Sequence, residues 1–141
     1  MIDFIVYGEP KGKGRPRATY NGRFTRIYTP QDTTNYENLI KLSYLDARQI
    51  NYMNGEQIKA KINIFQSIPK ATSKKKTQLM LNGNIRPTKK PDIDNIIKCV
   101  FDALNGIAFK DDTQIICVES QKYYDNEPRI EICLQEIKQI E

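Results

Sequence analysis

Residues 89–114 read KKPDIDNIIKCVFDALNGIAFKDDTQ, and the interpretation of the whole chain starts from this stretch. Its centre predicts an amphipathic helix, because apolar residues recur at the spacing of one helical face. Pro91 suits the entry to a helix, Asp92 suits the N-cap position, and Asn105-Gly106 is expected to end the helix. Residues 107–109 are expected to form a short extended piece after it. The apolar positions are Ile93, Ile96, Ile97, Val100, Phe101 and Leu104.

Two pairs of carboxylates flank this helix. Asp92 and Asp94 stand one residue apart at its start, and Asp111 and Asp112 follow its end. Each pair alone has a simpler interpretation, because first-turn carboxylates cap free amides and Asp-Asp is common in turns. The turn after the helix lets the chain return toward its start. The two pairs together therefore indicate a site for a divalent metal.

Lys98 lies one helical turn after Asp94 and leaves two alternatives open. It could form an exposed ion pair with Asp94, worth a few tenths of a kcal/mol. It could instead contact the phosphate of a substrate that the neighbouring carboxylates help to bind. Asp102, one turn further on, lies on the same polar side of the predicted helix.

Outside this stretch, the pattern predicts four strands and two more helices. Residues 2–8 form a β-rich run, and residues 57–66 alternate between apolar and polar. Residues 114–124 and 129–137 are expected to pair as a hairpin across the turn at 125–128. A helix is predicted from about residue 31 to residue 49, and Ser73 is expected to cap a short helix over 74–81.

The composition sets limits on the kind of protein and site. With 141 residues, the chain is expected to form one domain over residues 1–141, with no membrane span and no secretory signal. Three cysteines without zinc spacing indicate free thiols and a cytoplasmic location. The chain has no histidine, so any metal site must use oxygen ligands, which suits Mg²⁺ or Mn²⁺.

Positive charge is concentrated in two segments without acids, residues 10–30 and 69–90. They hold more than half of the 22 lysines and arginines, a distribution typical of proteins that bind a polyanion. The first segment is rich in Gly and Pro and includes Tyr20, Phe24 and Tyr28, so a loop or loose hairpin that contacts nucleic acid is predicted. Solvated lysines, or a disordered arm without a partner, are the alternatives. The candidate nucleic-acid contacts are Lys11, Lys13, Arg15, Arg17, Arg23, Lys70, Lys89 and Lys90.

The string KPDIDNIIKCVFDALNGIAFKDDTQI resembles the RusA family, Holliday-junction resolvases of bacteria and their prophages. The shared pattern is D-[LI]-D-N-[LI]-x-K, then DAL, a short linker and DD-x-Q. The N-terminal strand, the basic loop and the length also fit. The resemblance is specific over about 25 residues and general elsewhere, and the linker before Asp111 differs among members.

The resemblance implies a small α+β fold, with a mixed sheet packed against two main helices, and a homodimer. It implies that Asp92, Asp94 and Asp112 bind one or two Mg²⁺ and that Lys98 supports catalysis. Asp111 is an additional candidate ligand. The implied reaction is metal-assisted hydrolysis of a phosphodiester, by paired symmetric nicks in a four-way junction. No membrane partner and no organic cofactor are expected.

Two other interpretations remain open at this stage. The chain could bind DNA or RNA without catalysis, its carboxylates serving as caps and turns. It could also be a nuclease that acts on flaps, forks or other branched DNA. The basic segments fit all three interpretations, whereas the set of Asp92, Asp94, Asp112 and Lys98 favours an enzyme.

Overall fold

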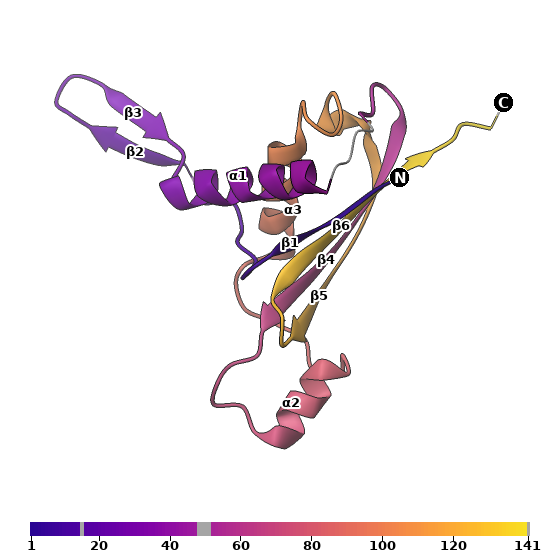
Figure 1. Ribbon diagram of the computed structural model, residues 1–141. Coiled ribbons are helices and arrows are strands. Elements are labelled where there is room, and N and C mark those ends of the chain that lie inside the picture. Colours follow the sequence, from indigo (N-terminus) through magenta and orange to yellow (C-terminus); the bar gives the residue numbers. More distant parts are fainter. Residues whose placement is uncertain (15, 48–51, 141) are drawn as a thin grey trace.

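The computed structural model describes residues 1–14, 16–47 and 52–140. In this part of the chain a four-stranded mixed sheet forms the centre of the molecule, with the strand order β1-β6-β4-β5. The strands are β1 (Ile2–Tyr7), β4 (Gln57–Ser67), β5 (Ile115–Asp125) and β6 (Arg129–Ile137). The sheet is strongly twisted (Figure 1).

The predicted pairing of the last two strands as a hairpin is wrong, although both strands exist where they were expected. β4 lies between them, parallel to β5 and antiparallel to β6. The connection can bridge the intervening strand, because two strand spacings amount to about 10 Å and residues 126–128 reach that far when extended. β4 gains backbone partners on both edges. This central position suits its fully buried residues Ile58, Ile62 and Ile64.

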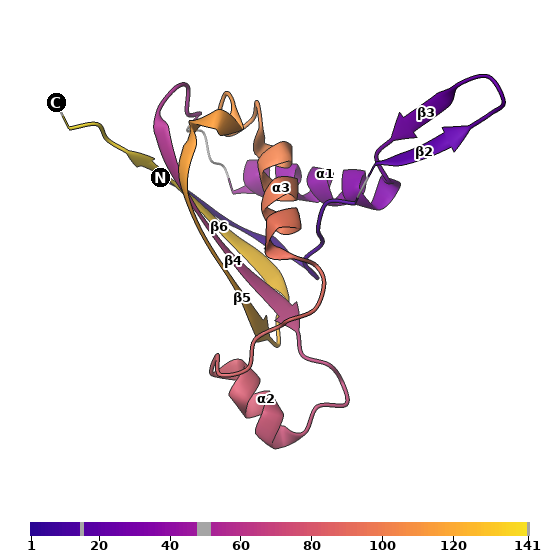
Figure 2. The ribbon, with the colours of Figure 1, turned by 180° about the vertical axis from the view of Figure 1, so that it is seen from behind.

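Two helices cover one face of the sheet. They are α1 (Gln31–Asp46) and α3 (Ile93–Leu104), which pack against each other above β1 and β5 (Figure 2). The predicted helix after Asp92 is confirmed, and its buried residues are Ile96, Cys99, Val100, Ala103 and Leu104. The sheet contributes alternate residues of β1, β4 and β6 to the same core.

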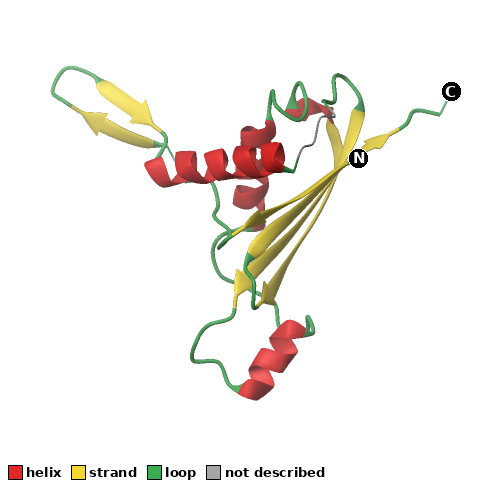
Figure 3. Cartoon of the chain, in the orientation of Figure 1, coloured by secondary structure: helices red, strands yellow, loops and turns green. Residues whose placement is uncertain are grey.

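Two elements project away from this core. The helix α2 (Lys74–Leu81) begins as predicted at Ser73, whose Oγ accepts a hydrogen bond from the backbone N–H of Lys76 at 3.3 Å. The strands β2 (Arg17–Tyr20) and β3 (Thr25–Tyr28) form a separate hairpin, called here the arm (Figure 3). Every residue of these two strands is exposed, so the basic loop predicted from the sequence contains a protruding hairpin.

The segment after α3 differs in detail from the prediction. Residues 107–109, expected to be extended, form a turn in which Phe109 makes isolated bridges to Met53 and Asn105. A short 3₁₀ helix, η1 (Asp112–Gln114), follows. Among the described residues, no helix is long and apolar enough to cross a membrane.

Candidate active site

The start of α3 presents two exposed carboxylates. Asp92 occupies the N-cap position with extended backbone dihedrals, as predicted, but its side chain makes no capping hydrogen bond. Asp94 lies in the first turn and is also exposed. Because a capping aspartate normally accepts a hydrogen bond from a backbone N–H of the first turn, the simpler interpretation of Asp92 loses its main support.

A basic loop lies directly over this end of the helix. Lys11, Lys13 and Lys90 line one pocket of about 740 Å³ together with Asp92 and Asn95. The backbone N–H of Lys13 donates a hydrogen bond to the carbonyl of Asn95 at 3.1 Å. The pocket therefore brings one candidate metal ligand together with three of the predicted nucleic-acid contacts.

Glycine at position 12 allows this close approach. A Cβ at that position would lie 2.9 Å from the Cβ of Asn95 and 3.2 Å from the Cβ of Pro91. The first of these distances is too short for two carbon atoms, so any larger residue would push the loop away from α3. The Gly/Pro pattern of residues 10–16 thus has a specific packing cause at Gly12.

A second group of carboxylates gathers at the other end of α3. The pKa of Asp112 is raised above its ordinary value, mainly because it shares a hydrogen bond with the carboxyl of Asp111 and is partly desolvated. The negative charge of Asp102 raises this pKa further, whereas Lys98 lowers it. The pKa of Asp111 is lowered, by the bond to Asp112 and by the backbone N–H of Thr113. Asp102, Asp111, Asp112 and Lys98 are thus electrostatic neighbours.

Asp111 also has a structural role. Its side chain accepts from the N–H of Thr113, and the side chain of Gln114 accepts from the N–H of Asp111, which together form a capping box. This agrees with the turn interpretation of Asp111 and leaves Asp112 as the member of the pair with fewer local hydrogen bonds.

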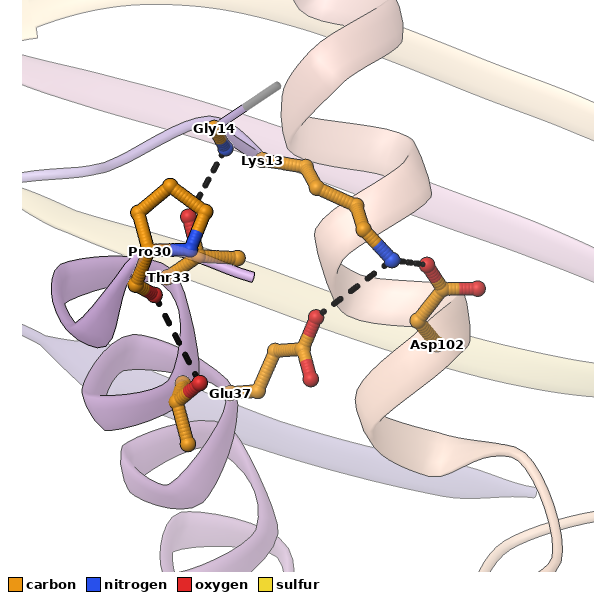
Figure 4. A network of polar contacts seen from close by, with 7 residues as sticks. Lys13, Gly14, Pro30, Thr33, Glu37 and Asp102 are labelled. Atoms are coloured by element: carbon orange, nitrogen blue, oxygen red, sulfur yellow. Dashed lines mark hydrogen bonds and ion pairs between the residues drawn. The ribbon is translucent and has the colours of Figure 1, made fainter. Parts of the chain in front are cut away.

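Lys98 is exposed on the middle of α3, between the two acidic groups. Among the described residues no ion pair within 4.0 Å joins Lys98 to Asp94, so the simple surface pair is not formed. Lys13 is different, because its ammonium is paired with Asp102 of α3 and lies 3.8 Å from Glu37 Oε1 of α1 (Figure 4). Asp102 and Glu37 were not predicted as part of the site.

The carboxylates suit Mg²⁺ by their chemistry, since all are oxygen donors. Their positions fit only in part. In the ranges 1–14, 16–47 and 52–140, no three acidic residues converge on one point that could hold an ion. Asp94 and Asp102 are two helical turns apart, about 12 Å along the axis. Asp92, Asp94 and Asp112 therefore stay predicted ligands.

The segment before Asp92 is fixed by two side chains that sequence reasoning missed. Gln66 Nε2 donates to the carbonyl of Lys90 at 3.2 Å, and Lys122 Nζ donates to the carbonyl of Lys89 at 2.6 Å. Partial burial lowers the pKa of Lys122, and the charge of Asp92 opposes that shift. The sequence contained one sign of the role of Gln66: it is a polar residue at a position where the alternation of the predicted strand 57–66 places the buried face. Lys122 gave none, because only the parallel pairing of β5 with β4 brings it here.

The other predicted nucleic-acid contacts lie around this site. Arg17 and Arg23 are exposed on the arm, and Lys70 is exposed before α2. Lys89 Nζ lies 5.8 Å from the ring centroid of Tyr124. Arg15 falls outside the described residues.

The fold and the site define a class: a small α+β protein in which carboxylates and acid-free cationic segments meet at one helix. The chain belongs to the RusA family, because the family model described as "Endodeoxyribonuclease RusA" matches residues 7–135. The chain is also 34% identical over 138 residues to "Uncharacterized protein YqaN" of Bacillus subtilis (strain 168), a match that covers 96% of each chain. The resemblance noted in residues 89–114 is thus confirmed over nearly the whole chain.

Proposed function

We propose that this chain, as one domain over residues 1–141, is a Mg²⁺-dependent endodeoxyribonuclease that resolves Holliday junctions by paired symmetric nicks. The pocket at the start of α3 carries this proposal. There the uncapped carboxylate of Asp92 shares a space of about 740 Å³ with Lys11, Lys13 and Lys90. A protein that only bound phosphates would gain little from an acidic side chain in that position, since like charges repel.

In this proposal Asp92, Asp94 and Asp112 hold the metal, with Mn²⁺ as an alternative ion. When bound, Mg²⁺ polarises the scissile phosphate and activates water at neutral pH. Asp111 is less suited to the metal, because its carboxylate is engaged in the capping box. Lys98 offsets the charge that develops on the phosphoryl oxygens, a role that agrees with its exposure and with the absence of an ion pair to Asp94 in the described part of the chain.

The arm is proposed to hold the DNA backbone. Its register places Arg17 opposite Tyr28 and Thr19 opposite Arg26, so these side chains share one face. The other face carries Ala18, Tyr20, Thr25 and Ile27 and has no charge. Arginines on one face suit phosphates, and the exposed aromatic rings of Tyr20 and Phe24 suit stacking on bases. Lys70, Lys89 and Lys90 would extend this cationic surface toward α2.

The homodimer and the paired cuts are proposed from the family alone. A two-fold dimer supplies two equal sites, and a four-way junction offers two equivalent strands. The expected test is sedimentation of the free protein, with a dimer as the main species.

A second candidate function is DNA or RNA binding without catalysis. It is favoured by one observation, that no three described acidic residues converge on an ion. The two candidates share the cationic surface and differ only in what the carboxylates do.

The deciding experiment incubates the protein with an end-labelled four-way junction, a fork and a linear duplex, in Mg²⁺ and in EDTA. We expect symmetric nicks in the junction in Mg²⁺ only, and none with Asp92→Asn, which should still bind the junction. Asp46→Asn is the matched control, because Asp46 is also exposed but lies at the last turn of α1, lining a different pocket beside β1.

Each other outcome has one meaning. Cleavage by Asp92→Asn at the wild-type rate would reject the catalytic assignment. Binding without cleavage by the wild-type protein, in Mg²⁺ and in Mn²⁺, would favour the second candidate. Preferred cleavage of the fork would keep the nuclease and change its substrate.

A further inference from the structure

Lys13 was predicted as a nucleic-acid contact, but the structure gives its ammonium two partners inside the protein. It donates to Asp102 Oδ2 on α3 and lies 3.8 Å from Glu37 Oε1 on α1 (Figure 4). The side chains of Lys13, Glu37 and Asp102 are 24%, 19% and 30% exposed. Ion pairs at this depth are less screened than those on the open surface.

The backbone on either side of this lysine is also attached to both helices. The N–H of Lys13 donates to the carbonyl of Asn95 on α3, and the N–H of Gly14 donates to Thr33 Oγ1 on α1 at 2.8 Å. At Gly14 a Cβ would lie 2.7 Å from Thr33 Oγ1, so this contact, like the one at Gly12, depends on glycine. Three consecutive residues thus form one docked segment across α1 and α3.

Without the lysine, the two acids would be poorly compensated. Glu37 Oε1 is buried and has no hydrogen-bond partner among the described residues, and Lys13 is the cation beside it. The hydrogen bond to Asp102 raises the pKa of Lys13 above its ordinary value, which agrees with an ammonium held in place by anions. Moving Lys13 to a DNA phosphate would leave both carboxylates facing each other unpaired.

We propose that Lys13, Asp102 and Glu37 form a positioning clamp that fixes the basic loop across α1 and α3. Lys13 then acts through Asp102 and does not touch the nucleic acid. The clamp sets the position of the arm, which begins four residues later at Arg17, relative to the carboxylates at the start of α3. DNA held by the arm would be aligned with those carboxylates only while the clamp is closed. This inference rests on the proposed function where it concerns DNA.

The clamp itself is tested on the free protein by amide hydrogen exchange at Lys13 and Gly14. Lys13→Met and Asp102→Asn should each speed exchange at both amides roughly tenfold, the size expected for the loss of one charge-assisted hydrogen bond. The double variant should be no faster than Lys13→Met alone, because once the ammonium is gone Asp102→Asn has no pair with Lys13 left to break. Lys11→Met, an exposed neighbour in the same loop, is the matched control and should leave exchange unchanged.

The link to DNA is tested with binding and single-turnover cleavage of a pre-bound junction. If Lys13 acts through Asp102, Lys13→Met should leave the salt dependence of binding unchanged, whereas Lys11→Met should flatten it by up to ~0.9. Lys13→Met and Asp102→Asn should slow the cut by a similar factor, about 10- to 100-fold for a misplaced substrate. Lys13→Arg, which keeps the charge, should restore most of the rate.

Three results would overturn the clamp: unchanged exchange in both single variants, additive effects in the double variant, or a salt slope that Lys13→Met flattens as much as Lys11→Met. A wild-type protein that neither cleaves nor binds the junction would instead reject the proposed function. The exchange experiment needs no DNA, so it would still decide whether the clamp exists.

Discussion

Gly12→Ala tests how tightly the basic loop is docked on α3. The added Cβ would lie 2.9 Å from the Cβ of Asn95 and 3.2 Å from that of Pro91. Asn95 lies in the first turn of α3 and Pro91 directly precedes the N-cap residue Asp92; the helix is anchored by its buried face in the core. The loop is the softer partner, so we expect the loop to lift while the helix stays in place.

The size of the effect follows from what lifting would break. The hydrogen bond from Lys13 N to Asn95 O is worth about 0.5–1.5 kcal/mol net. The half-buried pair of Lys13 with Asp102 adds up to about 1 kcal/mol. We expect the free energy of unfolding to fall by roughly 1–2.5 kcal/mol, within the usual range for overpacking. For a chain of this size that corresponds to a Tm lower by roughly 3–8 °C.

Thermal unfolding and amide exchange at Lys13 measure this change. Thr19→Ala serves as the control, because Thr19 is exposed on the arm, and it should stay within ~0.5 kcal/mol of wild type. Gly12→Ala should also slow cleavage of a pre-bound junction, as is expected for Lys13→Met. A Tm within about 1 °C of wild type together with unchanged exchange at Lys13 would refute the docking argument.

Three further predictions concern other parts of the site and fold. Lys98→Ala should cost at most ~0.5 kcal/mol of stability but slow single-turnover cleavage by ~10²-fold, and a rate within about threefold of wild type would remove Lys98 from the mechanism. Gln66→Leu should change the free energy of unfolding by less than ~1 kcal/mol, because it removes one hydrogen bond and also the buried side-chain oxygen of Gln66, which has no partner among the described residues. It should nevertheless slow cleavage, because the carbonyl of Lys90 loses the hydrogen bond that fixes it. An unchanged rate would contradict this. Arg129 lowers the pKa of Asp125, so this pair stabilises the fold above the unfolded-state pKa of ~3.9 and loses that effect as the pH falls through the lower folded-state value. In urea unfolding, Asp125→Asn should therefore be less stable than wild type by up to ~1 kcal/mol at pH 7, and this difference should shrink as the pH falls below the unfolded-state pKa of ~3.9. A difference that stays constant into acid would argue against the pair.

Local patterns in the sequence were enough to predict most of the elements. The apolar spacing from Ile93 to Leu104 gave α3, the alternation in residues 57–66 gave β4, and Ser73 marked the start of α2. These signals are local, because the apolar periodicity of a helix or a strand can be recognised within a short segment of sequence. The family could also be recognised from the sequence, because residues 89–114 contain its motif.

The order of the strands in the sheet could not be predicted from the sequence. A short turn between β5 and β6 favours a hairpin by proximity, yet β4 separates them, because pairing β4 on both edges satisfies the backbone of the most buried strand. That parallel pairing is also what brings Lys122 to the loop before Asp92. No periodicity encodes a contact between residues so far apart in the chain.

The role of Lys13 shows the same division. Its charge and its place in an acid-free segment correctly marked a cationic loop, and those facts belong to the sequence alone. Its partners lie 24 and 89 positions away, on two helices that pack against each other in the folded protein. The sequence determined which side chains carry charge. The packing of α1 against α3 decided that this ammonium lies between two carboxylates. It stays there because its departure would leave two partly buried acids unpaired, which costs free energy.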